Sequence, residues 1–80
     1  MKHKYKFNLV CRCPNDNSIN IYDAIVKSND IIQVEDFNKF QKKIYNEKYY
    51  QEQIFEILQD AFENVELIGT HLGVQIISSK

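Results

Sequence analysis

The 80-residue sequence lacks any long hydrophobic run. A helix that crosses a membrane needs about 20 consecutive, predominantly apolar residues, so no segment qualifies as a membrane span. The opening residues, Met-Lys-His-Lys-Tyr-Lys, also lack the apolar region of a signal peptide. We therefore expect a cytoplasmic protein that makes no contact with a membrane.

An excess of charge of one sign is also absent. Ten lysines and arginines stand against eleven aspartates and glutamates, which gives a formal net charge of -1. This balance excludes a protein that binds nucleic acid through bulk electrostatics. Any contact with nucleic acid must come from a local patch of cations. The candidates for such a patch are Lys2, Lys4, Lys6 and Arg12.

Cysteine is scarce, with only Cys11 and Cys13 in the chain. Two residues that are two apart in a strand point to the same face but cannot close an unstrained disulfide, so we expect free thiols in a reducing compartment. With His3 and His71 they offer the ligand types of a zinc site. The Cys-x-Cys spacing is atypical and the histidines lie near opposite ends of the sequence, so we expect no metal site.

The composition is otherwise typical of a globular domain. Hydrophobic residues make up 44% of the chain and charged residues 26%, as in ordinary soluble domains. No repeat, linker or low-complexity stretch interrupts the sequence, which predicts a single domain over residues 1–80. A domain of this size buries roughly 60% of the surface of its unfolded chain, so we expect marginal stability unless chains associate.

Alternating hydrophobicity predicts an antiparallel hairpin in the first third of the chain. One face of a strand over residues 5–13 carries Tyr5, Phe7, Leu9, Cys11 and Cys13. Residues 14–18, Pro-Asn-Asp-Asn-Ser, are dense in turn formers. A second strand is predicted over residues 19–26. One of its faces carries Ile19, Ile21 and Ile25.

Helical periodicity and a second pair of strands follow. Phe37, Phe40 and Ile44 predict a first helix from about Val34 to Tyr45. The spacing that predicts a second helix is that of Ile54, Ile57, Leu58, Ala61 and Phe62. Alternation over residues 65–70 and 73–78 predicts two further strands. The order β-β-α-α-β-β predicts an α+β fold in which two helices cover one face of a four-stranded antiparallel sheet.

Three short motifs accompany this order of elements. Cys13-Pro14 follows the first strand, Val34-Glu35 enters the first helix, and Tyr50-Gln51-Glu52 enters the second. In order and spacing they resemble the 7-cyano-7-deazaguanine reductase family of the tunnelling fold and its short QueF-like relatives. The resemblance spans about residues 7–78, and Leu72-Gly73-Val74 in the last hairpin also fits the short relatives.

The resemblance implies a role for each matching residue. The family's cysteine attacks a nitrile carbon and forms a covalent thioimide, which would make Cys13 the catalytic nucleophile. The family's aspartate that handles the proton follows this cysteine, and Asp16 is the nearest candidate. The residues implied to bind the substrate are Glu35, Tyr50, Gln51 and Glu52.

Departures from the family pattern favour one branch. The reductases carry a Glu-Ser-Lys-Ser type segment associated with nicotinamide binding, whereas this chain reads Glu35-Asp36-Phe37-Asn38. The short QueF-like relatives instead add ammonia to the nitrile and form the formamidine of archaeosine in tRNA, without a nicotinamide cofactor. The resemblance therefore implies an amidine-forming enzyme that needs no cofactor. Its substrate would be a 7-cyano-7-deazaguanine base, free or within tRNA or DNA.

Other functions stay open at this point. Gln51 stands where the family has a histidine, which removes a titratable partner for the nitrile nitrogen. A non-catalytic binding module of the same fold and an NADPH-dependent nitrile reductase are therefore alternatives. Structural interpretations also exist, because Cys13 suits a protein core, Asp16 a turn and the two glutamates the positive ends of helix dipoles.

The residue types themselves suit nitrile chemistry. Attack of a thiolate on a nitrile needs a proton for the developing negative nitrogen, so a thiol and an acid must flank a fixed ring. A guanine-like ring presents N–H donors, and one carboxylate accepts two of them in a plane. Either Glu35 or Glu52 could provide that carboxylate.

The predicted sheet also favours association. Four strands leave two exposed edges, and unpaired edge strands readily pair with another chain. Tunnelling-fold proteins join their sheets into rings with active sites between subunits, so the resemblance implies a homo-oligomeric ring. The aromatic residues available for such a contact are Tyr45, Tyr49, Tyr50 and Phe55.

Overall fold

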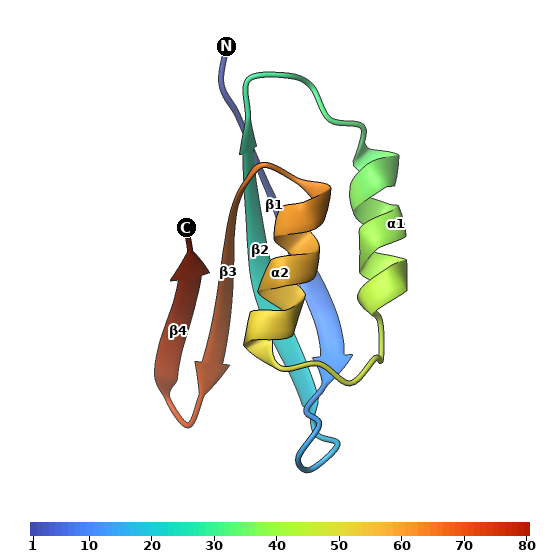
Figure 1. The fold of residues 1–80 in the computed structure, drawn as a ribbon, viewed down its shortest axis with the longest axis vertical. Helices are drawn as coiled ribbons and strands as arrows, with labels where there is room; N and C mark the ends of the chain where they lie inside the picture. Colours follow the sequence, from blue (N-terminus) through green and yellow to red (C-terminus); the bar gives the residue numbers. More distant parts are fainter.

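A computed structural model describes residues 1–80 as one four-stranded antiparallel sheet and two helices (Figure 1). The elements are β1 (His3–Arg12), β2 (Ile19–Ser28), α1 (Val34–Ile44), α2 (Gln51–Ala61), β3 (Asn64–His71) and β4 (Val74–Ser79). The strands lie in chain order, and both helices cover the same face, with α1 against β1 and α2 against β3. The predicted α+β fold with the order β-β-α-α-β-β is therefore confirmed.

The hairpin of β1 and β2 is longer than hydrophobic alternation predicted. Its ten residue pairs run from His3 opposite Ser28 to Arg12 opposite Ile19. The additional residues at the open end include Lys4 and Lys27, which are polar and exposed. Hydrophobic alternation does not detect such residues, whereas the backbone hydrogen bonds of the ladder continue through them.

The core fills the space between the sheet and the two helices. Its buried residues are Leu9, Cys11, Tyr22, Ala24, Val26, Phe37, Phe40, Ile44, Ile54, Leu58, Val65 and Leu67. The rings of Phe37 and Phe62 stack with their centroids 5.1 Å apart, which joins the beginning of α1 to the end of α2. Each helix has 11 residues, and neither is long and apolar enough to cross a membrane.

The three isoleucines of β2 share one face, and this face points away from the helices. Ile19 and Ile21 are 58% and 63% exposed. The register places Tyr22 opposite Leu9, so Tyr22 is the β2 residue that faces the core at this level. Because both faces of β2 carry apolar residues, alternation within the strand does not decide which face is covered, and the pairing with β1 does.

Candidate active site

The loop between β1 and β2 fixes the position of Cys13. The Cys13 amide donates to the Ser18 carbonyl at 2.8 Å, and the Asn17 amide donates to the Cys13 carbonyl at 2.9 Å. Asn17 takes a φ of 62°, in the left-handed region that asparagine tolerates better than most residues. Cys13 therefore sits at the first position of a tight, hydrogen-bonded loop, and its side chain is half-buried.

Asp16 belongs to the same loop and is held by Ser18. Its carboxylate accepts from the Ser18 hydroxyl at 2.7 Å and from the Ser18 amide at 3.0 Å. These bonds, with a smaller effect from the nearby Cys13 side chain, lower the pKa of Asp16 below its ordinary value. Asp16 therefore acts as a turn residue in the fold, and it also presents an ionised carboxylate close to the Cys13 thiol.

The segment between α1 and α2 brings the start of α2 to this loop. The Arg12 amide donates to the Glu47 carbonyl at 2.8 Å, and the Tyr49 amide donates to the Arg12 carbonyl at 3.2 Å. These bonds hold the segment beside the end of β1. The Tyr50 hydroxyl then donates to the Asn15 side chain at 2.7 Å, so the beginning of α2 and the loop of Cys13 form one connected unit.

Arg12, which was expected in a patch of cations, makes hydrogen bonds within the fold instead. The Arg12 guanidinium donates to the Asn46 side chain and to the Asn17 carbonyl, at 3.0 Å in each case. It thereby ties the loop to the segment before α2. The lysines of that patch lie toward the other end of β1 and are exposed.

A cavity of about 230 Å³ lies at the meeting point of the loop, the start of α2 and the ends of β3 and β4. Four of the predicted site residues line it, namely Cys13, Tyr50, Gln51 and Glu52. Tyr22 and His71 line it as well. No site role was predicted for Tyr22 from the sequence, and His71 was predicted only as a possible metal ligand. The structure thus brings a thiol, a carboxylate and an imidazole to one cavity.

Two predicted residues lie outside this cavity. Asp16 occupies the adjoining loop, beside Cys13. Glu35 lies in the first turn of α1, which starts at the end of the sheet that carries the N-terminus, whereas β1 ends just before Cys13 at the opposite end (Figure 1). Within one chain, Glu35 is therefore remote from Cys13 and Glu52.

Gln51 is buried and joins α2 to both strands of the last hairpin. Its side-chain nitrogen donates to the Ile76 carbonyl at 2.9 Å, to the Ser78 hydroxyl at 3.1 Å and more weakly to the Leu67 carbonyl at 3.4 Å. The residue is 8% exposed, and its side-chain oxygen has no hydrogen-bond partner. The amide nitrogen therefore stabilises the packing of α2 on the sheet, while the oxygen is a buried, unused acceptor close to Gly69.

Tyr22 lines the cavity of Cys13, and Cys11 is buried in the core two residues before Cys13. Burial, together with the negative charges that Cys11, Cys13 and Glu52 can carry, raises the pKa of Tyr22 to about 12. Burial also raises the pKa of the fully buried Cys11 thiol, and the neighbouring Cys13 adds to the effect. Both groups therefore stay protonated at neutral pH, and the thiol that reaches the cavity is that of Cys13.

Gly69 of β3 makes room for the side chains of Gln51 and Tyr22. A Cβ atom at position 69 would lie 2.6 Å from the Gln51 side-chain oxygen and 2.6 Å from the Tyr22 ring. We expect Gly69→Ala to lower the free energy of unfolding by about 1–3 kcal/mol, because the added methyl overpacks a filled site. Chemical denaturation followed by circular dichroism measures this loss. The matched control is Gly73→Ala, which meets no atom within 4 Å but has a φ of +80°, so its loss comes from backbone strain alone. Equal stability of Gly69→Ala and the unmodified protein would contradict the expectation.

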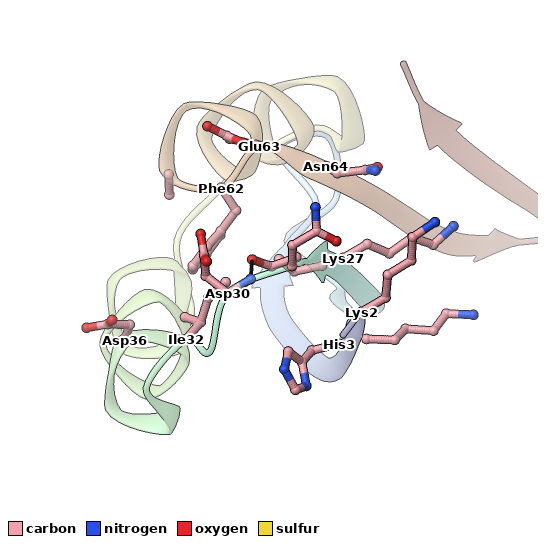
Figure 2. Close-up of a pocket in the computed structure, with 14 residues that line it drawn as sticks. Lys2, His3, Lys27, Asp30, Ile32, Asp36, Phe62, Glu63 and Asn64 are labelled. Atoms are coloured by element: carbon pink, nitrogen blue, oxygen red, sulfur yellow. Dashed lines mark hydrogen bonds between the residues drawn. The ribbon is translucent and has the colours of Figure 1, made fainter.

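A second, larger hollow of about 820 Å³ lies at the other end of the molecule (Figure 2). Cations and anions line it together, among them Lys2, Lys27, Asp30 and Glu63. It contains neither cysteine and none of the predicted site residues. The hollow therefore has mixed charge and no nucleophilic thiol.

The metal ligands considered from the sequence do not converge. His3 begins β1 and lines the hollow of Figure 2, while His71 ends β3 and lines the cavity of Cys13. No group of three or more histidine, cysteine, aspartate or glutamate side chains lies close enough together to hold a metal ion.

Comparison with known proteins adds one finding. No protein-family model matches the sequence, and no curated protein matches it. The fold is similar to that in the crystal structure of the archaeosine synthase QueF-Like in the apo form, with a TM-score of 0.77 and 14% sequence identity. The similarity covers 99% of this chain and 90% of that chain. At this level of identity the likeness shows the fold alone, so the predicted QueF-like fold is confirmed and the roles of single residues stay predictions.

Proposed function

We propose that this protein is a QueF-like enzyme that converts the nitrile of a 7-cyano-7-deazaguanine base to an amidine with ammonia. One observation carries the proposal: the half-buried Cys13 thiol and the Glu52 carboxylate line one cavity within a fold like that of an archaeosine synthase. The fold by itself does not define an activity. The pairing of a nucleophile with a group that can hold a guanine-like base supports the proposed activity.

The chemistry needs no cofactor. The Cys13 thiol loses its proton to the adjacent Asp16 carboxylate, and the sulfur then attacks the nitrile carbon. A C–S bond forms, one C–N π bond opens, and the nitrogen takes up a proton to give the thioimide. Ammonia next adds to the same carbon, the C–S bond breaks, and the amidine leaves while Cys13 regains its proton. The net reaction is addition of ammonia to the nitrile, so no electrons are exchanged.

Glu52 is the proposed anchor for the base. It lies in the first turn of α2, where the helix dipole stabilises a carboxylate, and it lines the cavity beside Cys13. A carboxylate in this position can accept two N–H bonds from the edge of a guanine-like ring. The ring of Tyr50 offers a surface for stacking, and its hydroxyl is already fixed by Asn15.

Gln51 would complete the pocket as an acceptor. Its nitrogen is held by Ile76, Ser78 and Leu67, so rotation of the amide is restricted, and the oxygen has no partner. In the proposed complex this oxygen would accept a further N–H from the base, which requires it to become accessible from its buried position close to Gly69. The arrangement supports a role for Gln51 in binding and none in proton transfer, because an amide does not titrate.

The location of Glu35 supports a site shared between copies. If Glu35 contacts the base, it must do so from a second chain, because it lies at the far end of its own. A ring of sheets joined at the edges of β1 and β4 would provide such a neighbour. We therefore propose a homo-oligomer in which one chain provides Cys13 and Glu52 and another provides Glu35.

Lysines on the sheet face away from the helices support the proposal that the substrate base is part of a nucleic acid. Lys4 lies opposite Lys27 in the β1–β2 register, and Lys6 follows on the same face. Lys27 forms an exposed ion pair with Glu66 at 3.3 Å. Such exposed pairs contribute little to stability, so a phosphate group can take the place of Glu66. These lysines form a local basic patch on a protein whose net charge is -1, as a contact with a tRNA or DNA backbone requires.

One observation favours a second candidate function, a binding module without catalysis. Gln51 serves the packing of the last hairpin and has no proton to donate at a useful pKa. In that case the cavity would bind the base and Cys13 would remain unmodified. An adduct experiment separates the two candidates.

The experiment is intact-protein mass spectrometry after incubation with 7-cyano-7-deazaguanine. We expect an added mass equal to the whole base, because nothing leaves when a thiol adds to a nitrile. Trypsin then separates the two cysteines, since Arg12 lies between them, and the added mass should appear on the peptide from Cys13 to Lys27. The control ligand is 7-deazaguanine without a nitrile, which should leave the mass unchanged. A folded protein that forms no adduct with the free base or with an RNA or DNA that contains it would overturn the enzymatic proposal.

A further inference from the structure

We propose that His71 is the general acid that protonates the nitrile nitrogen as Cys13 attacks the nitrile carbon. The inference rests on the proposed function and adds a residue to it. His71 is the one histidine of the cavity that also contains Cys13, Glu52 and Gln51. Imidazole is the side chain whose ordinary ionisation falls between pH 5 and 8, so it can give up and regain a proton in each turnover at neutral pH.

The topology places the thiol and the imidazole on opposite sides of the cavity. Cys13 follows β1, and His71 ends β3, with β2 between the two strands. β3 pairs with β2 only over Asn64–Ile68, and its last residues, up to His71, pair with β4 alone. Cys13 and His71 therefore line the cavity from different parts of the sheet. In the proposed arrangement a flat base lies in this cavity with its nitrile carbon toward the sulfur and its nitrile nitrogen toward the imidazole.

The backbone holds His71 in place. His71 pairs with Val74 across the β3–β4 hairpin, and only Leu72 and Gly73 lie between them. Both turn residues have positive φ, 49° and 80°, as a two-residue hairpin turn of this kind requires. His71 is exposed, so a ligand can approach it without any rearrangement of the core.

The other groups that face the cavity do not suit this step. Glu52 is the proposed anchor of the base, and the hydrogen bonds from Ser18 lower the pKa of Asp16, so Asp16 carries no proton to donate. Tyr22, Tyr49 and Tyr50 carry phenols, which are weaker acids than an imidazolium. The Gln51 nitrogen already donates to Ile76 and Ser78. His71 is thus the group that can deliver a proton to the nitrogen.

The proton balance of the step is closed. The thiol proton of Cys13 passes to Asp16 and then to water, the C–S bond forms, and the nitrogen takes a proton from the His71 imidazolium. Water restores the proton of His71 before ammonia enters. No oxidant or reductant takes part.

The test measures the rate of adduct formation with free 7-cyano-7-deazaguanine by rapid quenching and mass spectrometry. We expect His71→Ala to slow the rate about 10²-fold, the lower range for loss of a general acid. Imidazole added to the solution should restore part of the rate in His71→Ala and leave the unmodified protein unaffected. The matched control is His3→Ala, which removes the histidine of the distant hollow and should change nothing.

The outcomes are distinct. A slower rate with rescue by imidazole supports the inference, because a purely structural role of His71 would not respond to a soluble acid. An unchanged rate, or a slower rate without rescue in a folded variant, overturns it and leaves the proposed function intact. Absence of an adduct on the unmodified protein, both with the free base and with RNA or DNA that contains it, overturns both.

Discussion

Replacement of Cys13 by alanine should abolish the covalent adduct and reduce amidine formation by at least the order of 10³-fold. The physical reason is that the sulfur forms the bond to the nitrile carbon, and no other thiol reaches the cavity, because Cys11 is completely buried. Binding of the base should change only a few-fold, since Glu52, Tyr50 and Gln51 remain. Mass spectrometry measures the adduct, and isothermal titration with 7-deazaguanine measures binding.

Cys11→Ala provides a matched control for Cys13→Ala. It removes the same atom two residues earlier, within β1, from a thiol that faces the core. We expect this variant to be less stable, because it leaves a small void, and still to form the adduct at the normal rate once folded. An adduct that persists in Cys13→Ala, or one that disappears in Cys11→Ala alone, would show that Cys13 is not the nucleophile.

Leu58→Ala should lower the free energy of unfolding by about 2–5 kcal/mol. Leu58 is 0% exposed and lies on the buried side of α2, in the core between this helix and the sheet. Domains have roughly 0.05–0.15 kcal/mol of stability per residue, so this loss removes a large part of the stability of an 80-residue chain. We expect a population of unfolded protein at 37 °C. Urea denaturation at 15 °C, at several protein concentrations, measures the loss and any contribution from association.

The control for Leu58→Ala lies two residues away on the same helix. Glu56 is exposed, so Glu56→Ala should change the free energy of unfolding by less than about 0.5 kcal/mol. A loss below 1 kcal/mol in Leu58→Ala would mean that the core relaxes around the deletion and that α2 contributes less to stability than its burial indicates.

The fold was predictable from the sequence because its two periodicities are clear. Phe37, Phe40 and Ile44 mark one face of α1, and Ile54 and Leu58 mark one face of α2. The covered face of β2 was not predictable in the same way. Its isoleucines form a consistent apolar face, yet the register of the hairpin puts Tyr22 in the core, and register depends on contacts between strands that a single strand does not encode.

The candidate site was predictable where its residues lie close to a turn or a helix start. Cys13 and Glu52 follow local signals, and the structure brings both to one cavity. The partners of Gln51 depend on the last hairpin, more than 15 residues later in the chain, so its burial could not be inferred from its neighbours. His71 carried no local signal either. The side on which it lies follows from the alternation of β3, and its proximity to Cys13 only from the order of the strands in the sheet.

The segment between the helices has a consequence for how far another chain can extend the sheet. The amides of Asn46 and Tyr49 donate to the carbonyls of Val10 and Arg12, and so occupy the outer edge of β1 at the end near Cys13. The Gln41 side chain also donates to the Asn8 carbonyl at 3.0 Å, so a strand added at this edge can run only beside His3–Phe7. β4 is six residues long, close to that open length, so a neighbouring β4 would stop before it reached the loop of Cys13. A neighbour at the β1 edge would therefore leave the loop of Cys13 uncovered, because the chain itself has already filled that part of the edge.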